Sequence, residues 1–251
     1  MSPLDPAVHS ATVTLLFVLA VPVFVVLWWL PAPYGRHGRQ GWGPTIPGRI
    51  GWMVMEAPTI VVFGAVLALS PHGGEPVPLA LAGLWWLHYV YRTVVYPLRL
   101  PSVRPMPLPV VGSGLAFQLL NASANAAALG TADYGGWATD PRFGLGVVVF
   151  LAGQAVHHHG DHVLMRLRAR GDTGYSVPTG GLYTHVTNVA YLGELVTWLG
   201  WALATSTPAG LAMFVFTAAN LVPRARSNHA WYRETFADYP AGRRVLLPWI
   251  W

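Results

Sequence analysis

Seven long apolar segments dominate this sequence and constrain its fold more than any other feature. They fall near residues 12–30, 50–70, 79–97, 108–130, 143–165, 184–205 and 209–226. A helix needs about 20 apolar residues to cross the hydrocarbon core of a bilayer. Hydrophobic residues make up 53% of the chain and charged residues only 10%, far below the roughly 25% of a typical soluble domain. We therefore predict an all-α integral membrane protein with seven transmembrane helices.

The breaks between the segments contain proline, glycine and aspartate, which is the chemistry of turns rather than of a domain linker. The sequence has no internal repeat or low-complexity tract, so residues 1–251 are expected to form a single membrane domain. The first segment has no basic stretch before it and no small-residue cleavage site after it, which favours a retained span over a signal peptide. The absence of cysteine excludes disulfides and cysteine-ligated metal centres.

Arginine accounts for all fifteen basic residues, and its distribution predicts the orientation of the chain. Positive charge near the ends of spans marks the cytoplasmic side, and one set of alternate loops holds only Arg142. We therefore expect the N-terminus outside and the C-terminus in the cytoplasm, which agrees with an odd number of spans. Because the arginines are dispersed, the net charge of +5 does not indicate a nucleic-acid partner. The arginines assigned to the cytoplasmic side are Arg36, Arg39, Arg49, Arg99, Arg104, Arg166, Arg168, Arg170, Arg224, Arg226, Arg233, Arg243 and Arg244.

Polar side chains within the predicted spans gather toward the cytoplasmic side. An ionisable group at membrane depth costs roughly 2.5–3.5 kcal/mol on insertion scales, so each one needs a partner or a function. With a helical rise of about 1.5 Å per residue, all of them fall on the cytoplasmic side of the midplane. One shared cavity is the economical interpretation. The residues are Glu56, Tyr89, Arg92, His157, His158, His159, Asp161, Asn188 and Glu194.

Helical spacing aligns these residues into polar and aromatic faces, which must turn away from lipid. The third span carries a stripe at steps of three and four, and the fifth, sixth and seventh segments repeat the pattern. The stripes are Trp85, His88, Tyr89, Arg92 and Tyr96; His157, Asp161, Leu164 and Arg168; Thr187, Tyr191, Glu194 and Trp198; and Arg224, Asn228 and Tyr232.

Structural interpretations compete with functional ones at several of these positions. Tyr89 alone is compatible with a packing role, and Arg92 with Glu194 is compatible with a structural buried ion pair. Adjacent helical residues point about 100° apart, so the run from His157 to His159 does not predict a metal site. Glu56 has no basic residue within a helical turn, and an unpaired carboxyl in an apolar setting tends to stay protonated and can donate a hydrogen bond.

Nucleotide-binding loops are missing from the sequence. Neither the G-x-G-x-x-G fingerprint nor the P-loop occurs. A nucleotide cofactor, if there is one, would be bound by helix faces and arginines.

Several motifs, in order along nearly the whole chain, resemble those of one enzyme family. Residues 174–205 read GYSVPTGGLYTHVTNVAYLGELVTWLGWALAT, and the chain ends in HAWYRETFADYPAGRRVLLPWIW. Upstream matches are YGRH at 34–37, MEAP around Glu56, HYVYRTVVYP at 88–97, RPMP from Arg104 and GDHVLMRLR at 160–168. Together they resemble the steroid 5α-reductases, the 3-oxo-5α-steroid 4-dehydrogenases.

The resemblance implies a seven-span enzyme that reduces the 4,5 double bond of a 3-keto-4-ene steroid with NADPH. It assigns Glu56 and Tyr89 to the 3-keto oxygen, and Trp52 and Phe117 with them to the steroid pocket. Two departures concern the site: Met55 replaces a polar neighbour of Glu56, and Ala190 replaces an asparagine whose hydrogen bond is either lost or supplied by Asn188. The positions matching cofactor contacts are Arg36, Arg104, Asn121, His157, Asp161, Arg168, Tyr175, Asn188, Glu194, Trp198, Arg224, Asn228, His229 and Tyr232.

The chemistry of enone reduction accounts for these residue types. Hydride delivered to the β carbon drives negative charge onto the ketone oxygen, so a phenol at Tyr89 and a protonated carboxyl at Glu56 would form an oxyanion hole. The α carbon then takes a proton from water or a relay. Arginines at the cytoplasmic mouth suit a pyrophosphate and a 2′-phosphate. We expect steroid and membrane lipid as partners, in a bacterial-type inner membrane or an endomembrane, with the oligomeric state open and a monomer compatible.

Other protein classes remain as alternatives. A membrane S-adenosylmethionine-dependent methyltransferase of the isoprenylcysteine type would carry an Arg-His-Pro element where residues 187–191 read TNVAY. Sterol double-bond reductases are nearer rivals and differ in substrate. A seven-helix receptor or transporter is the third class, although transporters tend to show repeats and broken helices, and the sequence indicates neither.

Overall fold

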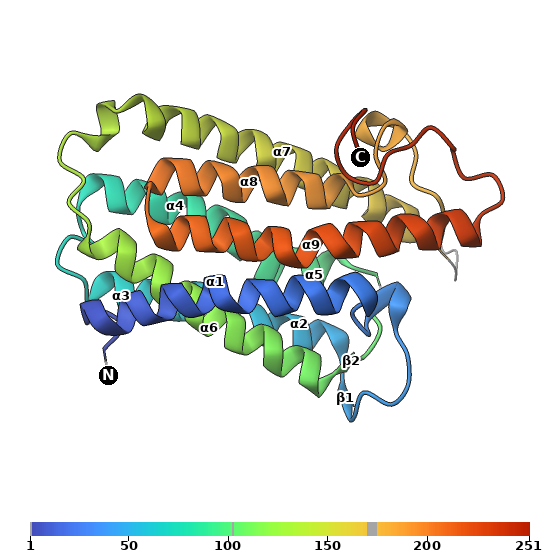
Figure 1. The fold of residues 1–251 in the computed structure, drawn as a ribbon, viewed down its shortest axis with the longest axis horizontal. Helices are drawn as coiled ribbons and strands as arrows, with labels where there is room; N and C mark the ends of the chain where they lie inside the picture. Colours follow the sequence, from blue (N-terminus) through green and yellow to red (C-terminus); the bar gives the residue numbers. More distant parts are fainter. Residues whose placement is uncertain (1, 102, 170–174) are drawn as a thin grey trace.

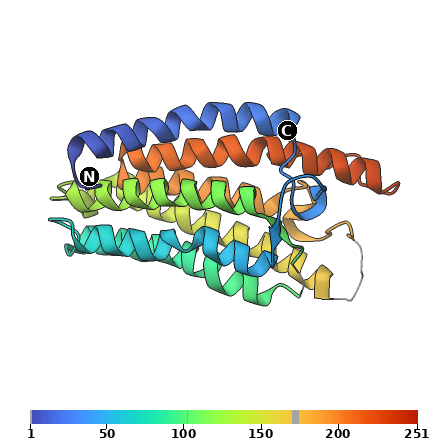
Figure 2. The same cartoon turned by 90° about the horizontal axis from the view of Figure 1, so that it is seen from below.

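The fold is built from helices that run side by side in one elongated bundle, with the two termini at opposite ends (Figures 1 and 2). The computed structural model describes residues 2–101, 103–169 and 175–251; Arg170, assigned above to the cytoplasmic side, lies outside them. All seven apolar segments are mainly helical. The α-helices are α1 Pro6–Trp29, α2 Gly48–Glu56, α3 Pro58–Ala68, α4 Pro76–Val90, α5 Tyr96–Arg99, α6 Leu108–Thr131, α7 Pro141–Ala169, α8 Val189–Thr205 and α9 Pro208–Thr235.

Short elements complete the described part of the chain. A π-helical turn, η2 Tyr91–Val95, joins α4 to α5, and 3-10 turns occur at η1 Gly35–His37, η3 Trp137–Thr139 and η4 Gly181–Thr184. Strands β1 Thr45–Ile46 and β2 Met106–Pro107 pair antiparallel, with Thr45 opposite Pro107 and Ile46 opposite Met106. This ribbon ties the loop before α2 to the loop before α6.

Two helical stretches among the residues that the structure describes are long and apolar enough to cross a membrane by themselves. They are Pro6–Trp29 and Gly48–Ala68, the second of which combines α2 and α3. The other helices carry more polar and small residues and pack against one another. An all-helical fold with candidate membrane spans is therefore confirmed.

The second and third apolar segments each contain a local irregularity in the helical hydrogen-bond pattern, although the backbone stays helical at both places. In the second, the hydrogen-bond pattern breaks between α2 and α3 because Pro58 has no N–H to continue the helical ladder. The free carbonyl of Glu56 accepts a hydrogen bond from the Thr59 hydroxyl at 2.6 Å. In the third, the π turn η2 precedes Pro97, which also lacks an N–H. Both interruptions lie beside residues of the predicted site, a common location for π turns.

Helices α7 and α8 pack with their backbones in close contact. Gly146, Gly153 and Gly160 recur every seven residues on α7, and a β carbon at any of them would collide with the backbone of α8. Gly193 and Gly200 repeat the arrangement from α8, where an added β carbon would meet the backbone of α7. Small residues at such spacing let helices approach closely. The contact brings the polar stripe of α7 against that of α8.

Aromatic side chains fill the middle of the bundle. Trp85, Trp198 and Trp201 are fully buried, and the Trp85 ring stacks on Phe63 with centroids 4.5 Å apart. The indole of Trp85 donates to the Thr59 carbonyl at 2.8 Å. This cluster packs directly against Tyr89. The polar residues of the predicted site are therefore bounded on this side by tightly packed aromatic rings.

The sixth segment begins later than expected. Helix α8 starts at Val189, so Thr187, which was assigned to its stripe, and Asn188 both precede the helix. The C-terminal tail holds this stretch: Val186 forms a parallel bridge with Arg244, and Thr187 N–H donates to the Arg244 carbonyl at 2.8 Å. Long-range contacts of this kind leave no local signal in the sequence.

Candidate functional site

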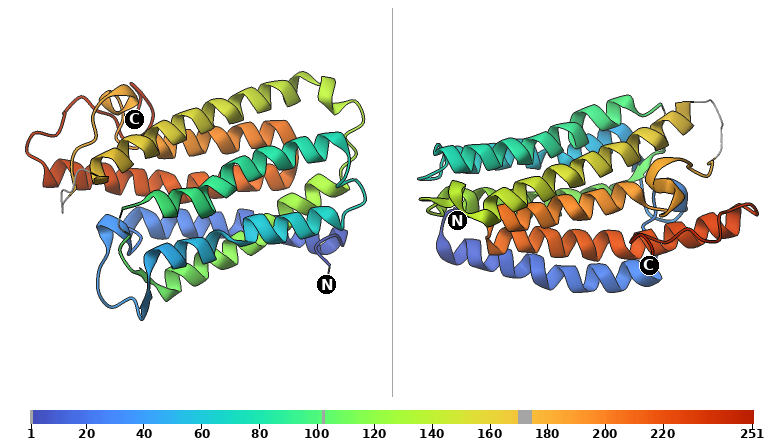
Figure 3. Two further views of the ribbon diagram at one scale, coloured as in Figure 1. Left: turned by 180° about the vertical axis from the view of Figure 1, so that it is seen from behind. Right: turned by 90° about the horizontal axis from the view of Figure 1, so that it is seen from above.

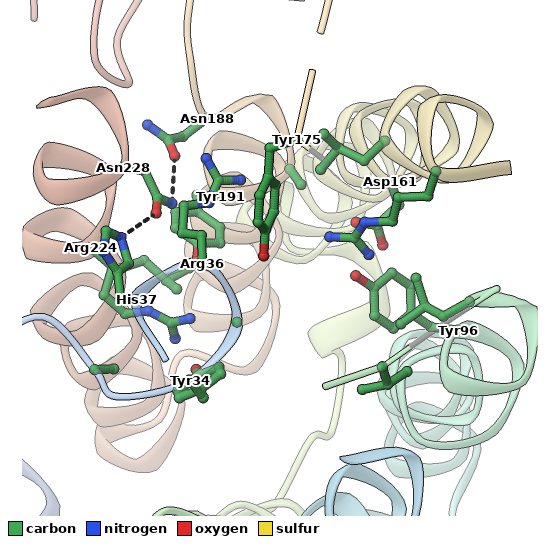
Figure 4. Close-up of a pocket in the computed structure, with 18 of the residues that line it drawn as sticks. Tyr34, Arg36, His37, Tyr96, Asp161, Tyr175, Asn188, Tyr191, Arg224 and Asn228 are labelled. Carbon is green, nitrogen blue, oxygen red and sulfur yellow. Dashed lines mark hydrogen bonds between the residues drawn. The ribbon is translucent and has the colours of Figure 1, made fainter. Parts of the chain in front are cut away.

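A cavity of about 380 Å³ lies among the loop after α1, the π turn η2, and helices α7, α8 and α9 (Figure 4). The bundle places side chains from segments far apart in the sequence around this one space. Most of the predicted site residues line it. They are Arg36, Trp52, Arg104, His157, Asp161, Arg168, Tyr175, Asn188, Glu194, Arg224, Asn228 and Tyr232.

The outer part of the cavity holds arginines that rest on aromatic rings. The Arg36 guanidinium carbon lies 4.5 Å from the ring centre of Tyr232 and 5.3 Å from that of Tyr175. Arg224 lies over Tyr34 at 4.8 Å and over Tyr191 at 5.5 Å. Cation–π contacts of this type orient a guanidinium while leaving its N–H groups available.

These arginines have no acidic partners in the described part of the chain. The ion pairs there involve other residues, and none joins Arg36, Arg104, Arg168 or Arg224 to a carboxylate within 4.0 Å. The buried Nη1 of Arg36 also lacks a hydrogen-bond partner among the described atoms. The cavity mouth is therefore a concentrated positive region with unused donors.

A chain of amide and imidazole groups closes one wall of the cavity (Figure 4). Asn228 Nδ2 donates to Asn188 Oδ1 at 3.0 Å, and Asn228 Oδ1 lies 3.1 Å from His37 Nε2. Asn188 uses both of its amide hydrogens on backbone, at the carbonyls of Ala225 and Val245. Burial lowers the pKa of His37, because the charged ring is desolvated there. The chain thus holds the loop after α1 against α9.

At the inner end of the cavity, Arg92 connects two carboxylates. Its Nε lies 3.0 Å from Glu56 Oε1, and its Nη1 lies 3.4 Å from Glu194 Oε2. The expectation that Glu56 is unpaired was wrong, because its partner comes from a different helix rather than from a neighbouring turn. The structural ion pair considered for Arg92 and Glu194 is present, and it is one half of this bridge. Trp52 caps the arrangement by donating to the Arg92 carbonyl at 3.0 Å.

Tyr89 and Glu56 lie behind Arg92, beyond the cavity lining. Both are almost fully buried, at 1% and 2% exposure. Asn121 Nδ2 donates to the Tyr89 hydroxyl at 3.3 Å, and Gln118 Nε2 donates to Glu56 Oε2 at 2.6 Å. The two predicted catalytic residues therefore share a hydrogen-bonded environment although they come from different helices.

Four other predicted residues lie away from the cavity lining. Asn121 is behind Tyr89, and Trp198 is buried against the Tyr89 ring with centroids 5.5 Å apart. His229 Nδ1 contacts the Thr187 hydroxyl at 2.6 Å. Phe117 stacks on Phe216 at 4.0 Å, between α6 and α9. These residues support the site from outside or line a neighbouring apolar region.

The structure also adds residues that the sequence analysis did not single out. Tyr34, His37 and Tyr183 line the cavity, and Gln118 and Asn125 lie behind the catalytic pair. Gln118, Asn121 and Asn125 follow one another at steps of three and four on α6, which is the same periodic signal that the other polar stripes carry. Tyr34 and His37 lie in a loop, where no periodic pattern exists.

Comparison with known proteins identifies relatives along nearly the whole chain. The family described as 3-oxo-5-alpha-steroid 4-dehydrogenase matches residues 104–251. The steroid 5-alpha-reductase DET2 of Gossypium hirsutum is 38% identical over 97% of each chain, and that of Solanum lycopersicum is 38% identical over 98% of each. The 3-oxo-5-alpha-steroid 4-dehydrogenase 1 of Macaca fascicularis is 35% identical over 86% of this chain and 84% of its own.

These matches decide among the classes considered from the sequence. The relatives are reductases, so neither a methyltransferase nor a receptor or transporter is favoured. The resemblance noted in the motifs is confirmed over nearly the full length. The chain belongs to the 3-oxo-5-alpha-steroid 4-dehydrogenase family, the steroid 5-alpha-reductases, which are membrane-associated oxidoreductases.

Proposed function

We propose that this oxidoreductase uses NADPH to reduce the 4,5 double bond of a 3-keto-4-ene steroid. One observation carries the proposal: a cavity lined with unpaired arginines ends at the buried group formed by Arg92, Glu56 and Tyr89 among the described residues. The arginine region suits phosphates, and the buried end suits a ketone on which charge develops. The relatives' names supply the substrate class.

The cavity residues fit a phosphorylated dinucleotide. Guanidinium groups bind phosphate oxygens through paired, charge-assisted hydrogen bonds, and Arg36, Arg104, Arg168 and Arg224 have no carboxylate partner among the described residues. Asp161 and Glu194 offer acceptors for hydroxyl and amide groups. NADPH, when bound there, supplies the hydride. The protein contributes binding, orientation and a dry environment.

Tyr89 and Glu56 are proposed to hold the 3-keto oxygen of the steroid. Charge builds on this oxygen as the 4,5 double bond is reduced, and donors placed at such an oxygen stabilise the transition state by about 3 kcal/mol each. The Tyr89 hydroxyl accepts from Asn121, and its own proton makes only a long contact with Gln118 Oε1, at 3.5 Å, so this proton can turn to a ligand. Burial of both side chains excludes water, which strengthens these hydrogen bonds.

Glu56 needs a proton before it can donate to the ketone. Both of its oxygens now accept hydrogen bonds, Oε1 from Arg92 and Oε2 from Gln118. Arg92 has a second carboxylate at Glu194, 3.4 Å away. We infer that Arg92 shifts toward Glu194 as ligands bind, and that Glu56 then takes up a proton. The α carbon of the steroid receives its proton from water or a relay.

Trp52 and Phe117 are proposed as walls of the steroid pocket. Trp52 lies beside Arg92, with the guanidinium 5.0 Å from its ring centre. Phe117 and Phe216 form a stacked apolar pair between α6 and α9. A lipid-soluble steroid would reach this region from the bilayer, whereas cytosolic NADPH would enter through the arginine mouth.

Seven membrane spans in a single domain, with the N-terminus outside, complete the proposal. The two termini lie at opposite ends of the bundle, as an odd number of spans requires (Figures 1 and 3). Since the chain has no cysteine, single cysteines at Ser2, Asp133 and Ala241 can report sidedness in sealed vesicles. Labelling by an impermeant maleimide is expected from the outside at the first two and only from the cytoplasmic side at Ala241→Cys. Any other pattern contradicts this topology.

Purified protein with a panel of 3-keto-4-ene steroids tests the activity directly. NADPH is expected to be oxidised only when steroid is present, with a product two hydrogens heavier by mass spectrometry. Product formation with NADH but not with NADPH would contradict the cofactor. Consumption of NADPH without a reduced steroid would contradict the substrate class.

A further inference from the structure

Three buried amides on α6 form a continuous chain behind the proposed catalytic pair. Gln118, Asn121 and Asn125 are 6%, 0% and 2% exposed, and their spacing places them on one face of the helix. One turn before Gln118, Gly114 leaves room for the Met55 side chain, so α2 lies close to α6. This close approach of the two helices lets the Gln118 amide on α6 reach the Glu56 carboxyl at the end of α2.

The indole of Trp201 fixes the direction of this chain. An indole N–H can only donate, and it donates to Asn125 Oδ1 at 2.8 Å. The Asn125 amide nitrogen must then face Asn121, where it donates to Oδ1 at 2.9 Å. Asn121 Nδ2 in turn faces Gln118 Oε1, at 3.1 Å. Each amide is thus oriented by the one before it.

The chain ends on both members of the catalytic pair. Gln118 Oε1 is occupied by Asn121, so its nitrogen points to Glu56 Oε2 and donates at 2.6 Å. Asn121 Nδ2 also donates to the Tyr89 hydroxyl at 3.3 Å. The Tyr89 proton has only a long contact with Gln118 Oε1, at 3.5 Å, which is a weak hydrogen bond.

We propose that Trp201, Asn125, Asn121 and Gln118 form a directional hydrogen-bond relay that positions Tyr89 as a donor and holds the Glu56 carboxyl beside it. In this relay the Tyr89 hydroxyl oxygen accepts a hydrogen bond from Asn121. The hydroxyl proton of Tyr89 is then directed to the substrate oxygen. The four residues are positioning residues, since they act through Tyr89 and Glu56. This inference rests on the proposed roles of those two side chains.

Isosteric variants test the direction of the relay separately from packing. Gln118→Met keeps the length of the side chain and removes the hydrogen bonds of Gln118 to Glu56, Asn121 and Tyr89. Asn125→Asp keeps the shape of the side chain but removes the amide donor. We expect each to lower kcat by about tenfold or more, the effect of losing one buried hydrogen bond. KM and the Kd for NADPH should change much less. Ser123→Ala, on α6 but bonded only to its own helix, should match the parent protein.

Gln118→Glu provides a readout that a purely structural role would not move. The introduced carboxyl can donate to Glu56 when it is protonated, whereas its ionised form would repel Glu56. The ratio of the kcat of this variant to the kcat of the parent, measured at the same pH, is therefore expected to be highest at acidic pH and to fall as the pH rises. The same variant also covers the case in which Gln118→Met fails to fold.

The outcomes separate this inference from the proposed function. If Gln118→Met and Asn125→Asp keep kcat within about twofold of the parent, while Glu56→Gln and Tyr89→Phe are impaired, the relay is overturned and the catalytic assignment stands. If Glu56→Gln and Tyr89→Phe retain full turnover, the catalytic assignment falls, and the relay falls with it. Loss of kcat in the relay variants with unchanged NADPH affinity supports the inference.

Discussion

Arg92 Nε lies 3.0 Å from Glu56 Oε1 and joins the π turn η2 to the end of α2. Both side chains depend on an irregular helix: Glu56 ends α2 before Pro58, and Arg92 lies in the wide turn before Pro97. The two interruptions therefore bring a cation and a carboxylate together inside the bundle.

Replacing Arg92 by methionine is expected to destabilise the protein and to abolish turnover. The change leaves the buried Glu56 carboxylate without its cation, and breaking one side of a buried ion pair costs about 3–5 kcal/mol. Thermal unfolding followed by tryptophan fluorescence measures the loss. The double variant Arg92→Met with Glu56→Gln should recover part of the stability but none of the turnover. A single variant as stable as the parent would contradict the importance of this pair.

Replacing Arg168 or Arg224 by glutamine is expected to weaken NADPH binding by about tenfold to a hundredfold, the value of one or two charge-assisted hydrogen bonds. At least one of the two substitutions should weaken the binding of NADPH more than the binding of NADH, since NADPH carries an additional 2′-phosphate. Isothermal titration with each cofactor gives both values. Arg142→Gln is the control, because Arg142 is exposed at the start of α7, where it pairs with Asp140. Equal losses in Arg142→Gln would indicate a nonspecific charge effect.

Protein stability should fall in acid partly through His37. Burial lowers its pKa below the ordinary value of about 6.5, so the unfolded chain binds this proton more readily than the folded one. The contribution of neutral His37 to folding stability is complete above about pH 6.5 and is lost as the pH falls toward the lowered pKa. Melting temperatures of parent and His37→Gln across this range test the sign. The gap between them should narrow in acid, and a gap that widens would refute the assignment.

The contact between α7 and α8 predicts opposite effects for two glycines of one helix. Gly153→Ala would push a methyl group into the backbone at Thr197, and overpacking of this kind costs about 1–3 kcal/mol. Gly144→Ala meets nothing within 4 Å and should be neutral or stabilising by up to about 1 kcal/mol through helix propensity. Thermal unfolding compares them. Equal behaviour would show that close packing at Gly153 is unimportant.

The sequence predicted those parts of the fold and site that have a periodic signal. Apolar length located all seven helical segments, and steps of three and four placed Asp161, Arg168, Glu194 and Arg224 on faces that now line one cavity. These predictions succeed because a side chain's direction on a regular helix follows from its position.

Features without such a signal were missed. The partner of Glu56 is 36 residues away, on another helix, so local spacing could not reveal it. The late start of α8 reflects its pairing with the C-terminal tail, and Tyr34 and His37 reach the cavity from a loop. Ala190 packs against Gly160 on α7, and its carbonyl lies 3.0 Å from His157 Nδ1. These contacts join α8 to α7, and the replacement of asparagine by alanine at this position gave no indication of them.

Deuterium transfer from NADPH that carries deuterium at both nicotinamide C4 positions is the most direct measurement of the central claim, made on the parent, Glu56→Gln and Tyr89→Phe. We expect the parent to yield a reduced steroid carrying one deuterium. Both variants should bind NADPH with parental affinity while turning over about a hundredfold more slowly, as loss of an oxyanion donor implies. Unlabelled product, or parental turnover in both variants, would contradict the mechanism.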